Sequence, residues 1–192
     1  MNAQSFHILT AGALVTLQNV VLTPDLTLDE ARLEGANWSV DYEGETNLKA
    51  DMGETKFRVV VSEPNVNRAL TAHLSANFPL KNVALSLFSE RVKISGNFVK
   101  GFLSLPVAVE AVIKVRNGVD IYFDLTDVKA GVGLPPAVVE VVQGQMNAEL
   151  RGVITRQLQE SPFPLYIDEI RTEPGRLIAQ GKVRLRFPFA SS

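Results

Sequence analysis

Apolar and polar residues alternate through most of this chain, and alternation with a period of two predicts β-strands. In the first third, the alternating segments are short and end at turn residues. We expect an antiparallel meander there, made of four segments: Leu14 to Leu22, Leu26 to Leu33, Trp38 to Tyr42 and Leu48 to Met52. A clearer half-buried strand, with Phe57, Val59 and Val61 on one face, follows them.

The apolar spacing changes to three and four residues in two places, and each change predicts an amphipathic helix. The first helix is expected to start at Ser62 to Pro64, because proline in a first turn loses no intrahelical hydrogen bond, and to run to about Phe78. The second is longer, from about Ala137 to Gln159, or about six turns.

The most regular alternation lies between and after the two helices. The Asn117-Gly118 pair predicts a tight hairpin, because both residues tolerate a positive φ. The predicted strands of this region are Val83 to Leu87, Val92 to Phe98, Leu103 to Val115, Val119 to Leu125, Leu165 to Arg171 and Leu177 to Phe189.

Long antiparallel strands and two amphipathic helices must bury their apolar faces against each other. We therefore expect one α+β domain over residues 1–192. Its strongly curved antiparallel sheet would wrap around the long amphipathic helix, with the second, shorter helix beside it.

Composition excludes several functions. The chain is 46% hydrophobic and 21% charged with a net charge of −2, so it has no general attraction for nucleic acid. It has no cysteine, and its two histidines, His7 and His73, have no metal-ligand spacing. No Gly-x-Ser-x-Gly or phosphate-binding loop occurs. We expect no enzyme activity, no metal and no cofactor.

Two features bear on location. The apolar stretch from Ile8 to Leu17 is too short to span a bilayer and has no Lys or Arg before it, so a cytoplasmic or membrane-peripheral protein is expected. A row of basic residues on the last strand is either its solvated face or a surface that touches anionic lipid headgroups. Its members are Arg176, Lys182, Arg184 and Arg186.

The predicted elements offer more apolar faces than a simple two-layer core needs. A helix inside a curved sheet can leave a gap, and a gap lined by Val, Leu and Ile suits an acyl chain. The alternative is a filled core in a structural or protein-interaction module.

Several segments carry a resemblance to a known family. Val59 to Leu70 resembles the strand followed by Ser/Thr-Glu-x-x-Leu-Asn-x-x-Leu of the LmeA-like phospholipid-binding family of bacteria, which is related to the tubular lipid-binding (TULIP) folds. Val92 to Gly96, Leu134-Pro135 and Arg171 to Leu177 continue the pattern, over about Leu33 to Val183. The resemblance implies a curved sheet around a helix and an apolar groove for lipid, and it brings no catalytic residues.

These arguments predict non-enzymatic binding, and by extension transfer, of a lipid or another lipophilic molecule. The partner is the lipophile, with peripheral membrane contact and without nucleic acid; the oligomeric state stays open. The expected lining residues are Val66, Leu70 and Leu74 from the first helix, Val107, Val109, Ile113 and Ile121 from the sheet, and Val142, Met146, Leu150 and Val153 from the long helix.

Overall fold

The structure is a computed structural model of the whole chain. It describes residues 5–43, 47–74, 80–100, 103–130, 140, 144, 147–148, 152 and 165–190. This part contains eleven strands and one continuous helix. They are β1 (Ser5–Thr10), β2 (Ala13–Thr23), β3 (Leu26–Gly35), β4 (Trp38–Glu43), β5 (Asn47–Ser62), α1 (Glu63–His73), β6 (Leu80–Phe88), β7 (Arg91–Lys100), β8 (Leu103–Arg116), β9 (Asp120–Ala130), β10 (Leu165–Glu173) and β11 (Arg176–Ala190).

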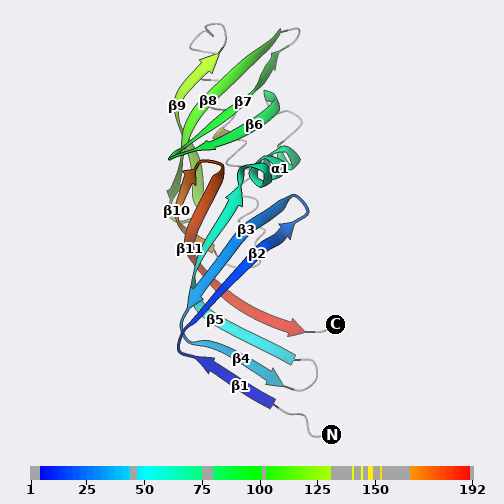
Figure 1. Cartoon of the computed structure of the whole chain (residues 1–192), viewed down its shortest axis with the longest axis vertical. Coiled ribbons are helices and arrows are strands. Elements are labelled where there is room, and N and C mark those ends of the chain that lie inside the picture. The colour runs from blue at the N-terminus through cyan, green and yellow to red at the C-terminus, as the bar shows by residue number, and fades with distance from the viewer. Residues whose placement is uncertain are drawn as a thin grey trace.

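The strands form two antiparallel sheets that follow one another along an elongated molecule (Figure 1). The larger sheet has seven strands, in the order β1-β4-β5-β11-β10, with β3 also on β5 and β2 on β3. The smaller sheet has four, in the order β6-β7-β8-β9. Both described ends of the chain lie at the far end of the larger sheet (Figure 1).

The centre of the larger sheet is the long pairing of β5 with β11, which runs from Asn47 to Ser62. Along its other edge β5 pairs first with β4 and then with β3, so the sheet forks. The fork lies at Gly53, whose positive φ of 54° suits a residue without a side chain. Its N–H donates to the Asp51 carboxylate at 2.8 Å, and the hydroxyl of Thr55 donates to the carbonyl of Met52 at 2.8 Å. These bonds fix the bend locally.

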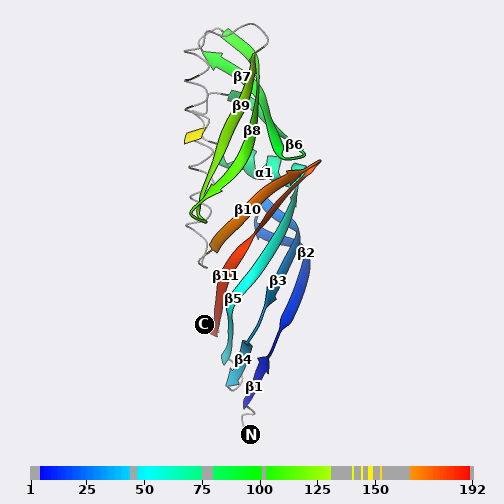
Figure 2. The same ribbon diagram turned by 90° about the vertical axis from the view of Figure 1, so that its left-hand side faces the viewer.

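Two hairpin tips of the smaller sheet join the larger sheet along β10 and its turn. At one end the N–H of Ile167 donates to the carbonyl of Gly118 at 2.7 Å. At the other, the N–H of Glu90 donates to Thr172 at 3.0 Å, and the N–H of Gly175 donates to Leu87 at 3.1 Å. Figure 2 shows β10 at this junction between the sheets.

An apolar contact accompanies these bonds; we call it the junction cluster. Phe57, Ile167, Val183 and Leu185 of the larger sheet are buried with Ile121 of the smaller sheet, and Ile113 and Val115 pack against them. Because side chains from both sheets fill it, neither sheet covers its apolar face alone.

The predicted α+β class is wrong for the described chain. Its residues form two antiparallel sheets with one short helix, and not one curved sheet wrapped around a long helix. Alternation predicted an apolar face on each strand, but it did not show what covers that face. At the junction cluster a second sheet covers part of it. The long helix expected from Ala137 to Gln159 lies outside the described residues, apart from five isolated positions.

Other predictions had mixed outcomes. The Asn117-Gly118 hairpin is confirmed, with φ values of 54° and 73° between paired β8 and β9. The simple meander is wrong, because β3 and β4 both pair with β5 and not with each other. The first helix starts as predicted, but it ends at His73, and Leu74 already has extended backbone.

Gly181 offers a test of the junction. It lies opposite Phe57 and Ile167, beside the irregular step in β10, and a Cβ there would overlap the carbonyl oxygen of Tyr166. We expect Gly181→Ala to lower the free energy of unfolding in urea by about 1–3 kcal/mol. Gly12→Ala is the control, since its Cβ would meet only Gly35, at 4.0 Å. Equal stability of the two variants would contradict this packing.

Candidate functional site

Helix α1 is held against the free edge of β6 by polar side chains. The side-chain amide of Asn67 donates to the carbonyl of Leu85 at 2.7 Å and accepts from the Leu85 N–H at 2.7 Å. The carboxylate of Glu63 accepts from the N–H of Leu87, also at 2.7 Å. A spacing of four residues places Glu63 and Asn67 on one face of the helix. The backbone N–H groups of Leu85 and Leu87, two residues apart, both point from the strand toward that face. The helix therefore supplies the partners that a neighbouring strand would otherwise give.

The start of α1 is anchored by the larger sheet. The N–H of Glu63 donates to the carbonyl of Gly175 at 2.9 Å. The carboxylate of Asp29 accepts from the N–H of Ser62 and, at 3.4 Å, from the side-chain amide of Asn65. Ser62 is the N-cap residue of α1, but its hydroxyl makes no capping bond. Helix position thus depends on residues distant in sequence.

The hydrogen bonds that Asp29 accepts also change the pKa of its carboxyl group. Partial burial works to raise the pKa of the Asp29 carboxyl, but the hydrogen bonds from Ser62 and Asn65 outweigh it and hold that pKa below its ordinary value. The ionised carboxylate is the form that accepts these bonds, so the anchor is complete at neutral pH.

Beneath α1 lies an apolar cluster, which we call the helix–sheet cluster. Leu70 of the helix is buried in it with residues of all four strands of the smaller sheet. The buried members from the sheet are Leu80, Leu85, Leu87, Val92, Ile94, Val107, Val109, Ala111 and Phe123. Half-buried Val66, Leu74 and Ile113 pack at its margin. Val66 also packs against a third cluster, on the larger sheet, formed by Leu28, Ala31 and Val61.

The structure brings most of the predicted lining residues together. Six of the seven that it describes belong to the helix–sheet cluster, and Ile121 belongs to the junction cluster. Ile113 packs against both clusters and so connects them. The other four residues, Val142, Met146, Leu150 and Val153, lie outside the described residues. Ligand contact at all eleven stays a prediction.

Burial divides the described lining residues into two groups. Leu70, Val107, Val109 and Ile121 are core residues, with Val109 at 0% exposure. Val66, Leu74 and Ile113 are half-buried. Only the second group offers surface to a ligand without opening the core.

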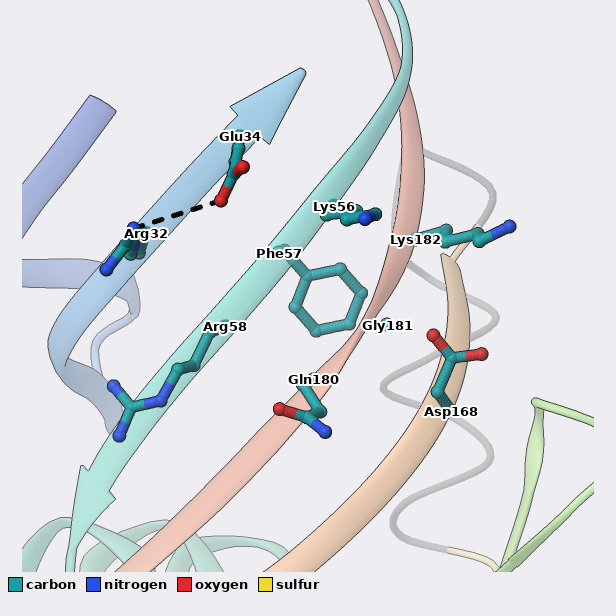
Figure 3. A pocket seen from close by; sticks show the side chains of 9 residues that line it. All are labelled: Arg32, Glu34, Lys56, Phe57, Arg58, Asp168, Gln180, Gly181 and Lys182. Carbon is teal, nitrogen blue, oxygen red and sulfur yellow. Dashed lines mark ion pairs between the residues drawn. The ribbon is translucent and has the colours of Figure 1, made fainter. Parts of the chain in front are cut away.

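A hollow of about 340 Å³ on the larger sheet was not predicted (Figure 3). Its walls come from β3, β5, β10 and β11, and the ring of Phe57 lies among charged side chains. The lining residues are Arg32, Glu34, Lys56, Phe57, Arg58, Asp168, Gln180, Gly181 and Lys182. They come from four separate segments, so only strand register brings them together. Gly181, a glycine within an alternating strand, was the one available signal.

The cations of this hollow are largely engaged by carboxylates. Arg58 pairs with Glu30 at 2.9 Å, and Arg32 lies 3.8 Å from Glu34. Lys182 pairs with Glu54 at 3.0 Å, and that hydrogen bond and charge raise the pKa of the lysine. The hollow is thus a surface network of ion pairs and differs from the apolar groove that the sequence predicted.

The basic row on β11 shows the same pattern. Arg176 pairs with Glu173 at 3.4 Å, and Lys182 pairs with Glu54. Arg184 is exposed, and the side chain of Arg186 lies outside the described part. This pairing favours the solvated face of a strand over a dedicated headgroup surface.

The described residues also bear on metal binding and on membrane spanning. Within the described ranges, no three His, Asp or Glu side chains are grouped so that they could hold a metal ion. Among the same residues, no helix has the length and apolar character needed to cross a membrane.

These observations define a class of protein that is mainly β and has extended apolar clusters. The sequence model of the LmeA-like phospholipid-binding family matches residues 12–182 of the chain. The chain therefore belongs to the LmeA-like phospholipid-binding family, which confirms the resemblance and extends it to β2. Membership points to lipid as the partner and to binding over catalysis. Neither the curated proteins nor the solved structures give a significant match.

Asn67 tests how α1 is docked. Asn67→Ala leaves the N–H and C=O of Leu85 without their side-chain partners, and we expect a loss of about 2–4 kcal/mol in the free energy of unfolding. Asn67→Asp keeps one acceptor and should fall between the wild type and Asn67→Ala. Arg68→Ala, at the exposed neighbouring position, is the control. A loss no larger than in this control would show that the bonds do not hold the helix.

Asp29 predicts a pH dependence. Because its folded-state pKa is lowered, its contribution to stability is complete above roughly pH 4 and is lost as the pH falls through that lower pKa. Between pH 6 and pH 3 the wild type should therefore lose more free energy of unfolding than Asp29→Asn, which can still accept from Ser62. Urea titrations at both pH values measure this difference, and identical pH slopes would contradict the assignment.

Proposed function

We propose that this protein binds phospholipid without catalysing a reaction, and that residues 1–192 act as one lipid-binding domain. The observation that carries the proposal is the family match over residues 12–182. Transfer of the bound lipid between membranes is a natural extension of such binding.

Continuity of the apolar clusters supports an acyl-chain site. Ile113 packs against the helix–sheet cluster and the junction cluster, and Val66 packs against the helix–sheet cluster and the third cluster. We call the path along these residues and Leu74 the apolar seam. Each methylene buried against such a surface contributes about 0.8 kcal/mol, so a seated acyl chain would gain several kcal/mol.

In this proposal the half-buried residues of the seam contact the lipid, and the fully buried ones support them. Val107 and Val109 would act as the floor, because displacing them would open the core. Their burial is also the observation that favours the second candidate, a protein-interaction module with a filled core. Direct measurement of lipid uptake separates the two.

Ile113→Trp tests the seam. The larger ring would occupy space next to both clusters, and we expect fluorescent phospholipid uptake from vesicles to fall about tenfold, equivalent to losing contact with about two methylenes. Val112→Trp is the matched control, because it is the neighbouring half-buried residue on the opposite face of β8. Circular dichroism melting establishes that both variants fold. Equal uptake by both folded variants would exclude the seam as the lipid site.

A further inference from the structure

Strand β2 is an edge strand without a charged side chain or a proline, and its pairing with β3 shifts register between Val21 and Thr23. Among the described residues it pairs with β3 alone, and Figure 2 shows it at the outer margin of the larger sheet. No Asp, Glu, Lys or Arg precedes Asp25, and β2 contains no proline. Natural edge strands usually carry charges or proline that prevent association. Here the free edge instead exposes Leu14, Leu17, Val21 and Leu22, with Val21 at 68% and Leu22 at 56% exposure.

The backbone N–H and C=O groups along the free edge of β2 determine what kind of partner fits it. A free edge presents unpaired N–H and C=O groups, and these cannot enter the hydrocarbon of a bilayer without losing their hydrogen bonds to water. Another β-strand satisfies those groups and covers the apolar side chains at the same time. The chemistry of β2 therefore favours a strand as its occupant over a lipid surface.

The order of residues in β2 favours a second copy of β2 as the partner strand. Counted outward from Gln18, leucine occurs at Leu14 and Leu22, and valine at Val15 and Val21. An antiparallel pair of identical strands centred on Gln18 places Leu14 opposite Leu22 of the second copy, and Val15 opposite Val21. Two-fold interfaces need such self-complementarity, because each contact occurs twice. The absence of charge also removes like-charge repulsion across the axis.

We propose that β2 pairs with β2 of a second copy of this chain, antiparallel and about a two-fold axis at Gln18, so that the larger sheet continues through a dimer. Asn19, with a φ of 53°, lies next to the axis, so this positive φ occurs at equivalent places in both strands. The inference goes beyond lipid binding and does not depend on it.

Cysteine cross-linking tests the register, because the chain has no cysteine of its own. Gln18→Cys should form a covalent dimer under mild oxidation or with a short bis-maleimide. Leu14→Cys and Leu22→Cys should each cross-link poorly alone but readily when mixed, since the two positions face each other. Ser104→Cys, exposed on β8, measures random collision. Cross-linking of all variants at this background level would overturn the proposal.

A charge at the axis tests the interface itself. Sedimentation velocity over a concentration series should show a wild-type dimer. Gln18→Lys places two lysines opposite each other and should weaken the dimer at least about tenfold, while neutral Gln18→Asn should not. Melting curves check that both variants fold, as expected at an exposed position. A monomer at all concentrations, or a dimer unaffected by Gln18→Lys, would overturn the proposal. So would a monomer whose binding to phosphatidylcholine vesicles is lost in Leu22→Lys, and that result would assign the edge to membranes.

Discussion

The burial of apolar surface where the two sheets meet is the contact on which the rest of the structure depends. Ile113, Val115 and Ile121 of the smaller sheet cover Phe57 and Val183 of the larger one. Without that cover each sheet would expose one apolar face to water, at a cost of about 25 cal/mol for each Å². Hydrogen bonds from both hairpin tips to β10 and its turn fix how the faces meet. The contact also makes the apolar interior continuous along the molecule.

Helix α1 completes the interior at a second point. Its apolar side covers the smaller sheet through Leu70, while Asn67 and Glu63 replace the missing strand at the edge of β6. Asp29 and Gly175 hold its start from the larger sheet. One short helix thus connects the two sheets with few residues. Glu63, Asn67 and Leu70, which lie in the segment that resembles the family, each make a contact that a substitution would remove.

The sequence predicted strand positions well because alternation and turn residues are local. The hairpin at Asn117-Gly118 and the start of α1 followed from the backbone preferences of the residues themselves. Pairing partners could not be predicted in this way. Alternation shows which face of a strand is apolar, but it does not show that β5 pairs with both β4 and β3, or that Gly53 bends a continuous strand. The expected single sheet failed for this reason.

The same distinction applies to the candidate site. The stripe predicted for the first helix, Val66, Leu70 and Leu74, could be predicted to face inward. The structure places all three at the helix–sheet cluster, although Leu74 follows the end of α1. Ile121 alternates as regularly as Val109, but it belongs to another cluster because β9 reaches the junction. The polar hollow depended on the register of four strands, which no single segment encodes.

Phospholipid binding by the folded chain is the central claim, and native mass spectrometry with lipid extraction tests it most directly. The purified protein, incubated with phospholipid vesicles and separated from them, should carry a one-to-one adduct that extracts as intact phospholipid. A protein that stays free of lipid after this exposure, while its circular dichroism shows a folded chain, would contradict the claim.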